Sequence, residues 1–584
     1  MRKRGRPRKY PLLEAPIKLP KRKRGRPRKY PLLTATTNID ISYISSNPTF
    51  EASRQKEING LLEKGVFKVY NIKDIPPGVR LFNSRFVDDI KHQGTPNAYE
   101  KSRLVVQAYN DHEKELILTQ SPTIQRVSQR LILCLASMLP DMDLYLRDIS
   151  QAYVQSTTEL NRPFYVRPPE ELSNTLGIGD IVLKVVKPLY GIPEAGNHWF
   201  KTYHTHHIDQ LDMAQSTFDP CLLYRNSNGG TNPGQSTFGI VGLQTDDTLF
   251  LANQSFASEE QEELRKARFM AKEREMLSPS TPIKFNGGLI TQEPNGDILL
   301  TQKRQCEKIT TVKSSISGNI SPKEQYIAQR ARGAYIASTC QPEASFDLSF
   351  AAQITDPMEE DIKRLNKRLQ WQLDHQNRGL RFIKLDIESL QLLVFTDASF
   401  ANNKDLSSQI GYLIVLSDGQ KANILHWSSI KCKRVTRSVL ASELYAMAHG
   451  YDISVAIKST LDLILQHHRS GRPIPLVLCT DSKSLYDCIV RLGTTQEKRL
   501  MIDVMGLRQA YERKQISEVK WIAGGSNPAD AMTKTSSKAC DALERLISTN
   551  SIDLQAIGWV ERTGTSGDIT RDIKDENASA LGVN

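Results

Sequence analysis

The sequence has no long hydrophobic run, no paired cysteine motif and, over most of its length, no excess of one charge sign. No apolar segment approaches the roughly 18 residues that span a bilayer, and no secretory signal opens the chain, so we expect no membrane partner. The eight cysteines are scattered without a Cys-x-x-Cys pair. Their spacing argues against a zinc knuckle or a disulfide framework and favours reduced thiols inside a cell.

Positive charge is concentrated at the N-terminus. Residues 1–33 hold 14 Lys and Arg and one Glu, whereas the remaining 551 residues hold 63 basic and 64 acidic side chains. The 584-residue chain is 39% hydrophobic and 24% charged, which is typical of a soluble globular protein of about two to four domains. Any nucleic-acid surface on the globular part is therefore a local patch.

The basic tail is a repeat. The sequence "KRGRPRKYPLL" occurs at 3–13 and again, identically, at 23–33. Each copy resembles an AT-hook, in which a slim Arg-Gly-Arg-Pro strand enters the narrow minor groove of A·T-rich duplex DNA. A passive basic tail or a nuclear localisation signal is the alternative. The residues that the resemblance assigns to DNA binding are Arg4, Gly5, Arg6, Pro7, Arg8, Arg24, Gly25, Arg26, Pro27 and Arg28.

Three aspartates mark the ends of apolar strands in the next part of the chain. A strand beginning at residue 143 delivers Asp148 at its end, and a hairpin over 236–252 carries Asp246 and Asp247 at its turn. For a lone Asp-Asp pair, a surface turn is the better explanation. If the two strands lie side by side, however, the three carboxylates form a cluster that can hold two divalent ions about 3.5–4 Å apart.

The motifs around these aspartates resemble those of reverse transcriptases from copia-type retrotransposons. They are "RDISQAY" (147–153), "LYGIPEAGNHWF" (189–200), "DPCLLY" (219–224) and "QTDD" (244–247), in the family's order. The resemblance covers nearly all of 50–375. It implies an α+β polymerase domain of right-hand form, with fingers, palm and thumb, that copies an RNA template from a DNA primer with deoxynucleotides.

The same resemblance implies roles for single residues. Asp148 and Asp246, with Asp247 beside them, would bind two Mg²⁺ ions, or Mn²⁺ in their place. The ions would activate the primer 3′-hydroxyl and neutralise the pyrophosphate leaving group. Tyr153 would lie beneath the incoming sugar and exclude a 2′-hydroxyl; the alternative is a packed core tyrosine. Lys101 and Arg103, in the segment that resembles the fingers, would grip the triphosphate, or else lie on a solvated strand face.

Two departures from the family's pattern put the efficiency of synthesis in doubt. Pro193 and Glu194 occupy the neighbourhood where the family has a Gln, and an acid near a triphosphate is unfavourable unless it points away. Gln244 stands where the family has an aromatic residue, two places before the Asp pair.

A second set of four acids begins near residue 390. A strand over 392–400 carries Asp397, two strands follow, and a helix then carries Glu443. Asp481 lies at a strand-to-helix junction, and Asp530 lies at a helix start after another strand. The predicted order is β-β-β-α-β-α-β-α. For Asp397 or Asp481 alone, a helix N-cap explains the residue better.

The motifs that contain these four acids resemble the RNase H domain that follows reverse transcriptase in copia-type elements. They read "TDAS", "SELYA", "TDSKSL" and "NPADAMTK". The resemblance implies an α/β domain with a mixed five-stranded sheet. It also implies two Mg²⁺ ions held by Asp397, Glu443, Asp481 and Asp530, and hydrolysis by water of the RNA strand of an RNA–DNA hybrid.

These observations predict five segments and leave one functional alternative open. The sequence shows nothing that resembles capsid, protease or integrase, so we expect a fragment, a truncated copy or a retained remnant, in the nucleus or cytoplasm. The alternative is an idle relic that only binds AT-rich DNA. We expect the charged run at 258–268 to be an ordinary solvated helix. The segments are a disordered tail (1–33), fingers and palm (34–265), thumb and connection (266–385), RNase H (386–540) and a C-terminal tail expected to be disordered (541–584).

Overall fold

The computed structural model describes residues 49–91, 93–94, 96, 98–176, 180–226, 237–313, 320–469 and 471–558. The hook-like repeats and the chain from residue 559 onward lie outside these residues. The chain divides into a unit of residues 1–49 with 90–100 and a unit of residues 50–89 with 101–584, and both predicted acidic clusters belong to the second. Among the described helices, none is long and apolar enough to cross a membrane.

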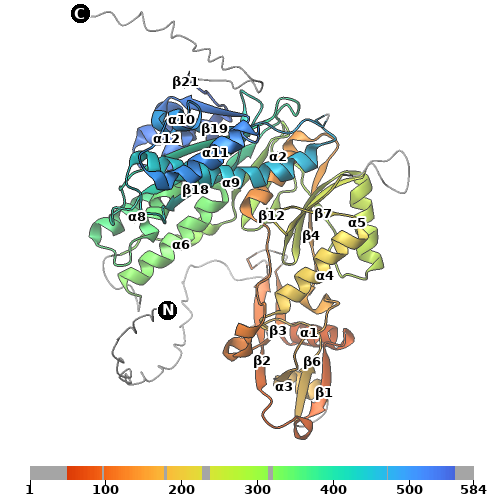
Figure 1. Ribbon diagram of the computed structural model, residues 1–584. Coiled ribbons are helices and arrows are strands. Elements are labelled where there is room, and N and C mark those ends of the chain that lie inside the picture. Colours follow the sequence, from red (N-terminus) through yellow and green to blue (C-terminus); the bar gives the residue numbers. More distant parts are fainter. Residues whose placement is uncertain are drawn as a thin grey trace, which may run out of the picture. The chain divides into compact units, whose positions relative to one another are not determined.

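The first sheet has the strand order β1-β6-β5-β2-β3. Figure 1 labels β1, β2, β3 and β6 of this sheet. Leu104 and Val106 of β3 are buried, because every second residue of this strand faces a core shared with Ile58 and Leu61 of α1. The elements are α1 (Glu51–Glu63), β1 (Phe67–Asn71), β2 (Leu81–Lys91), β3 (Tyr99–Val106), β5 (Phe164–Arg167), α3 (Glu170–Leu176) and β6 (Ile181–Val185).

The second sheet, β11-β4-β10-β9-β8-β7, is covered by helices on both faces. A Cβ at Gly242 of β9 would lie 3.0 Å from Ile132 of α2, and one at Gly239 would lie 2.6 Å from Phe256 of α5. Residues three apart in a strand point to opposite faces, so α2 and α5 lie on opposite sides. The elements are α2 (Arg126–Met138), β4 (Asp143–Asp148), α4 (Ala195–Gln210), β7 (Ala214–Gln215), β8 (Leu222–Asn226), β9 (Phe238–Gln244), β10 (Asp247–Ala252), α5 (Gln254–Lys266) and β11 (Glu275–Met276).

Two expectations for this region need correction. The charged run at 258–268 is not simply solvated, because Phe256, Glu260 and Leu264 of α5 are buried at a helical spacing of four residues. In addition, β11 pairs with β4, so the second sheet continues beyond the boundary predicted at residue 265.

The third sheet, β12-β13-β14-β15, packs against α6. A capping box between Ser321 and Glu324 begins α6, in which each side chain bonds the other's backbone amide. The helices α6, α7 and α8 contact one another. The elements are β12 (Ile283–Phe285), β13 (Gly288–Gln292), β14 (Ile298–Gln302), α6 (Pro322–Cys340), α7 (Ser345–Ala352), α8 (Glu359–Asp374) and β15 (Leu380–Phe382).

The fourth sheet is mixed, as predicted, with the order β18-β17-β16-β19-β20-β21. Strands β16, β17 and β18 are antiparallel neighbours, whereas β19 is parallel to both β16 and β20. The predicted five strands are present, and a short sixth, β21, pairs with β20. The elements are β16 (Gln391–Ser399), β17 (Gln409–Ser417), β18 (Ala422–Lys431), α9 (Val439–Leu465), β19 (Leu476–Thr480), α10 (Lys483–Ile489), α11 (Met501–Glu512), β20 (Glu518–Ile522), α12 (Ser537–Thr549) and β21 (Ala556–Gly558).

The sequence prediction did not include α11, and it placed a domain boundary inside α12. Helix α11 buries Val504, Leu507, Ala510 and Tyr511. Helix α12 crosses the boundary predicted at residue 540, because Leu543 and Leu546 continue its buried stripe. The expectation of a disordered tail from 541 is therefore wrong as far as β21.

Arg130 of α2 links three parts of the second unit. Its buried guanidinium donates hydrogen bonds to the carbonyl oxygens of Leu425 in β18 (2.7 Å) and Ser338 in α6 (2.9 Å). It also lies 4.0 Å from the ring centre of Trp427. In addition, buried residues of the second and fourth sheets belong to one continuous hydrophobic core.

Candidate active sites

Strand pairing brings the three predicted aspartates of the polymerase segment together. Asp247, the first residue of β10, is the direct partner of Asp148, the last residue of β4. The backbone amide of Ile149 donates to the carbonyl oxygen of Asp246 at 2.8 Å. The side-by-side arrangement predicted for the two strands is confirmed, and the three carboxylates form the first cluster.

The turn that carries Asp246 is held by α4. Thr245 has a φ of 55°, an uncommon conformation for a β-branched residue. The indole nitrogen of Trp199 donates a hydrogen bond to the Thr245 carbonyl oxygen at 2.7 Å. Gln244, one of the two departures from the family's pattern, leaves its Oε1 buried without a hydrogen-bond partner. Trp199, in the "NHWF" segment of α4, thus fixes the backbone of the turn that carries Asp246.

Electrostatic repulsion within the first cluster is strong. Burial, followed by the charges of Asp246 and Asp148, raises the pKa of Asp247 to about 7. Desolvation and then Asp148 also raise the pKa of Asp246, although that side chain remains exposed on one side. The Lys272 ammonium lies 2.5 Å from Asp148 Oδ2. The protein therefore compensates the negative charge of the cluster only in part, and a bound cation would stabilise the charged carboxylates.

The predicted nucleotide-binding residues lie around Asp246. The pKa of Asp246 is raised overall, but the positive charges of Arg103 and Lys101 oppose that rise. Burial and then the charge of Asp246 raise the pKa of Tyr153, whose ring centre lies 5.0 Å from that of Tyr190. The Arg103 guanidinium lies 5.7 Å from the Tyr190 ring centre. Two cations and two aromatic rings therefore flank the exposed aspartate.

Glu194, the other departure, is paired within the protein. Arg162 donates to both of its carboxylate oxygens, at 2.8 and 2.9 Å, and also to Asp111 at 2.6 Å. Glu194 is buried. Its charge is therefore compensated by Arg162, which removes the conflict that the sequence suggested.

A buried ion pair lies next to the first cluster and fixes its backbone. Arg147, next to Asp148 in β4, makes two hydrogen bonds to Glu260 of α5, at 3.0 and 2.6 Å. Its guanidinium also donates to the Lys272 carbonyl oxygen at 2.8 Å. Neither Arg147 nor Glu260 has appreciable exposure. The pair fixes both the strand end that presents Asp148 and the backbone that presents Lys272.

The four predicted acids of the C-terminal part form a second cluster. Oxygen atoms of Asp397 in β16, Asp481 after β19 and Asp530 in the turn before α12 all lie within 4.8 Å of one another. Glu443 faces them from α9, since the charges of Asp397 and Asp481 both act on it. Parallel pairing of β16 with β19 brings the first two strand ends together.

Burial dominates the electrostatics of the second cluster. Desolvation and then Asp397 raise the pKa of Asp530 to about 7, and they raise the pKa of Glu443 well above its ordinary value. The pKa of Asp481 is raised by the same two effects. Glu443 Oε2 and Asp530 Oδ1 are buried and have no hydrogen-bond partner.

One lysine and one threonine contact the second cluster. The Lys534 ammonium lies 3.3 Å from Asp397 Oδ1 and 3.2 Å from Asp530 Oδ2. The Thr533 hydroxyl donates to the other oxygen of Asp397. Asn527 is buried and donates to the Thr396 carbonyl oxygen at 3.0 Å, which fixes the loop before Asp530.

Both donor sets have the chemistry that a hard divalent cation prefers, but among the described residues only Asp397, Asp481 and Asp530 bring carboxylate oxygens within 4.8 Å of one another. All the candidate ligand atoms are carboxylate oxygens, which Mg²⁺ and Mn²⁺ prefer. The unpaired buried oxygens of Glu443 and Asp530 are the clearest sign, because an unsatisfied buried carboxylate is costly.

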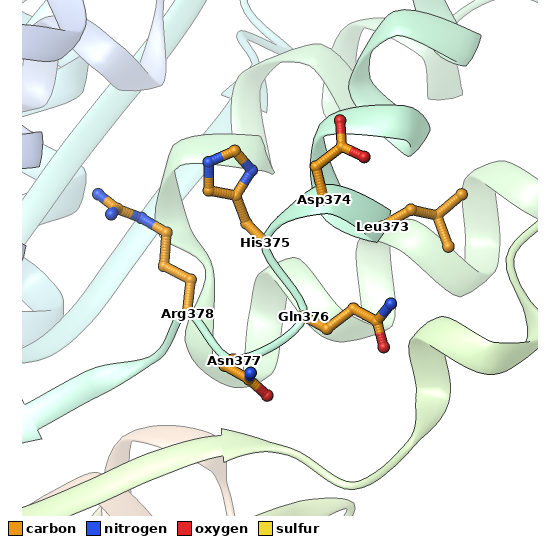
Figure 2. Close-up of a pocket in the computed structure, with 6 residues that line it drawn as sticks. All are labelled: Leu373, Asp374, His375, Gln376, Asn377 and Arg378. Carbon is orange, nitrogen blue, oxygen red and sulfur yellow. The ribbon is translucent and has the colours of Figure 1, made fainter.

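A pocket of about 540 Å³ lies elsewhere, at the turn after α8. Its lining consists of Leu373–Arg378, and Figure 2 shows these six side chains around the turn. Gln341 donates to the His375 carbonyl oxygen at 2.9 Å, and Arg378 pairs with Glu343. No predicted site residue lines this pocket.

Residues 67–319, which contain the first cluster, match the family model described as reverse transcriptase (RNA-dependent DNA polymerase). This segment is therefore similar to the reverse transcriptase domains that the model describes. Over 515 residues the chain is 24% identical to the transposon Ty1-GR3 Gag-Pol polyprotein of Saccharomyces cerevisiae (strain ATCC 204508 / S288c), which covers 82% of this chain. The chain spans only 28% of that relative's length.

Solved structures similar to the chain include a foamy viral protease-reverse transcriptase in complex with double-stranded DNA. It covers 79% of this chain and 68% of its own, at 14% identity and a TM-score of 0.44. The N-terminal RNase H domain of rv2228c from Mycobacterium tuberculosis covers 27% of this chain and 98% of its own, at 18% identity and a TM-score of 0.20.

Sequence reasoning assigned no role to several residues at these sites. Tyr190 lies within the quoted "LYG" segment and Lys534 within "NPADAMTK", so their motifs offered a signal. Lys272 and Glu260 lie in stretches without a distinctive pattern. Only the strand pairing and the course of α5 place them at the first cluster.

Proposed function

We propose that the reverse transcriptase domain is an active RNA-directed DNA polymerase of the copia type. The observation that carries the proposal is the direct pairing of Asp148 with Asp247 beside the exposed Asp246. A cluster open on one side suits a reaction whose substrates must enter and leave. The expected partners are an RNA template, a DNA primer and deoxynucleotides.

In this proposal Asp148, Asp246 and Asp247 hold two Mg²⁺ ions, or Mn²⁺ in their place. When bound, such ions lower the pKa of a hydroxyl nucleophile and stabilise charge on the leaving group. Lys101 and Arg103 attract the triphosphate, since their positive charges already act at Asp246.

The aromatic pair gives the site its preference for deoxynucleotides. Tyr153 lies against Tyr190, so its ring cannot easily turn away from a bound sugar. A rigid ring in this place favours a sugar without a 2′-hydroxyl.

We further propose that the C-terminal part is a ribonuclease H that acts on RNA–DNA hybrids. Asp397, Glu443, Asp481 and Asp530 would hold two divalent ions, and water would be the nucleophile. The support is the convergence of four acids from four elements and the unpaired oxygens of Glu443 and Asp530.

For the tail we propose binding to AT-rich duplex DNA and a nuclear location. The support is the identical repeat at 3–13 and 23–33 alone. A peptide of residues 1–33 should bind an A·T duplex more tightly than a G·C duplex, and a version with Arg6 and Arg26 changed to Ala should lose this preference. Equal binding of the two duplexes by the peptide would refute the proposal.

Primer extension tests the polymerase assignment. The full chain should extend a DNA primer on an RNA template with deoxynucleotides and Mg²⁺, and Asp246→Ala should not. Asp209→Ala is the matched control, because Asp209 is an exposed aspartate on α4. Absence of extension by the parent, with the tail peptide still binding A·T duplex, would favour the idle relic.

A further inference from the structure

Lys534 lies where a divalent ion would be expected to bind. Its ammonium is within 3.3 Å of Asp397 Oδ1 and within 3.2 Å of Asp530 Oδ2. It thus bridges carboxylates from two separate elements, β16 and the turn before α12. One positive charge already neutralises part of the second cluster.

The remaining contacts of these acids are distributed unevenly. Thr533 occupies the second oxygen of Asp397, so both oxygens of that carboxylate are engaged. In contrast, Asp530 Oδ1 and Glu443 Oε2 are buried and unpaired. One half of the cluster is therefore satisfied by the protein, and the other half is left open.

The first cluster differs in this respect. Lys272 contacts Asp148, but this lysine is 55% exposed and Asp148 35% exposed. Lys534 is 39% exposed, whereas Asp397 is only 2% exposed. Since burial weakens screening by solvent, the attraction between Lys534 and its carboxylates is the harder one for an ion to displace.

We propose that Lys534 is a resident counter-cation that competes with the divalent ion at the second cluster. The ammonium must leave Asp397 and Asp530 before one ion can take both carboxylates. It thereby stabilises the acids when no ion is bound and raises the ion concentration at which hybrid cleavage begins. Only the effect on hybrid cleavage rests on the proposed ribonuclease function, whereas the competition between Lys534 and the ion does not depend on it.

The test measures Mg²⁺ binding by calorimetry in the full chain, without nucleic acid. Asp246→Asn and Asp247→Asn are present throughout, so that the second cluster dominates the signal. In this background Lys534→Met should bind Mg²⁺ about tenfold more tightly than the parent, because a competing charge at close range is gone. Lys534→Arg should bind like the parent.

A matched control and a folding check accompany the titration. Lys538→Met removes an exposed lysine four residues further along and should leave the affinity unchanged. In EDTA, Lys534→Met should unfold at a lower temperature than the parent, and Mg²⁺ should raise its unfolding temperature more. If Lys534→Met does not fold, Lys534→Gln, which keeps polarity without charge, takes its place.

An equal or weaker Mg²⁺ affinity in the folded neutral variant would overturn the proposal. A purely structural lysine would give weaker binding on removal, so the direction of the change decides. Hybrid cleavage by the unsubstituted chain is measured separately. Its absence would count against the ribonuclease function, whereas the affinities decide the role of Lys534 in either case.

Discussion

The two acidic clusters of this chain use the same side chains in opposite surroundings. In the first cluster Asp246 is exposed and cations and aromatic rings flank it. In the second, Asp397 and Glu443 are 2% and 5% exposed, and Lys534 pairs with Asp397 and Asp530. The first cluster is therefore open to solvent at Asp246, whereas the second holds buried carboxylates.

Their supports differ as well. The first cluster depends on one hairpin, a buried Arg147–Glu260 pair behind it and the Trp199 hydrogen bond to its turn. The second collects its acids from a strand, a helix and two junctions of one mixed sheet. Since the two clusters lie on different sheets, a change of one side chain at one cluster should leave the other intact.

The largest expected effect separates the two clusters by activity. Asp481→Asn should reduce hybrid cleavage by about 10³-fold, because it removes one ligand from a fixed electrostatic site. Primer extension should be unchanged. The exposed Asp541→Asn on α12 serves as the matched control. Loss of both activities in Asp481→Asn would show that the clusters are not independent.

The next effect concerns the support of the first cluster. Glu260→Gln should destabilise the protein by about 3 kcal/mol, because it leaves the Arg147 guanidinium buried without its counter-charge. Chemical unfolding measures the change. Glu262→Gln breaks an exposed pair with Arg265 in the same helix and should have no measurable effect. Equal effects of the two variants would contradict the supporting role of the buried pair.

A smaller effect follows from the raised pKa values. Asp247 and Asp530 have a pKa of about 7 in the fold, well above the ordinary value of about 4 for Asp. The folded state therefore binds more protons than the unfolded state between about pH 4 and 7, and stability falls as the pH rises through this range. In EDTA the unfolding temperature should drop by a few degrees from pH 5 to pH 8.

Mg²⁺ should reverse that loss and raise the unfolding temperature more at pH 8 than at pH 5. The double variant Asp247→Asn, Asp530→Asn should show a flatter pH dependence in EDTA. A stability that rises with pH over this range in the parent would contradict the assignment of raised pKa values to the clusters.

The smallest effect tests selectivity at the first cluster. Tyr153→Val should raise the use of ribonucleotides relative to deoxynucleotides about tenfold, because the ring that crowds a 2′-hydroxyl is removed. Tyr109→Val changes an exposed tyrosine and is the control. Unchanged selectivity in Tyr153→Val would favour a packing role for this residue.

Much of the architecture follows from local sequence patterns. Apolar runs predict the strand that ends at Asp148 and the two strands on either side of Asp246, and the Asp pair between those two strands predicts the hairpin. The predicted boundary at residue 540 divides α12, although Leu543, Leu546 and Ile547 continue its apolar face. The pairing of Glu194 with Arg162 could not be predicted, because the two residues are 32 positions apart in the sequence and only the fold brings them together.

The most direct test of two separate sites is a single reaction with a labelled RNA template and a labelled DNA primer. We expect the parent both to extend the primer and to cut the template in Mg²⁺. Asp246→Ala should only cut a preformed hybrid, and Asp481→Asn should only extend. If either variant lost both products, or if neither change affected its own product, the assignment of one activity to each cluster would be wrong.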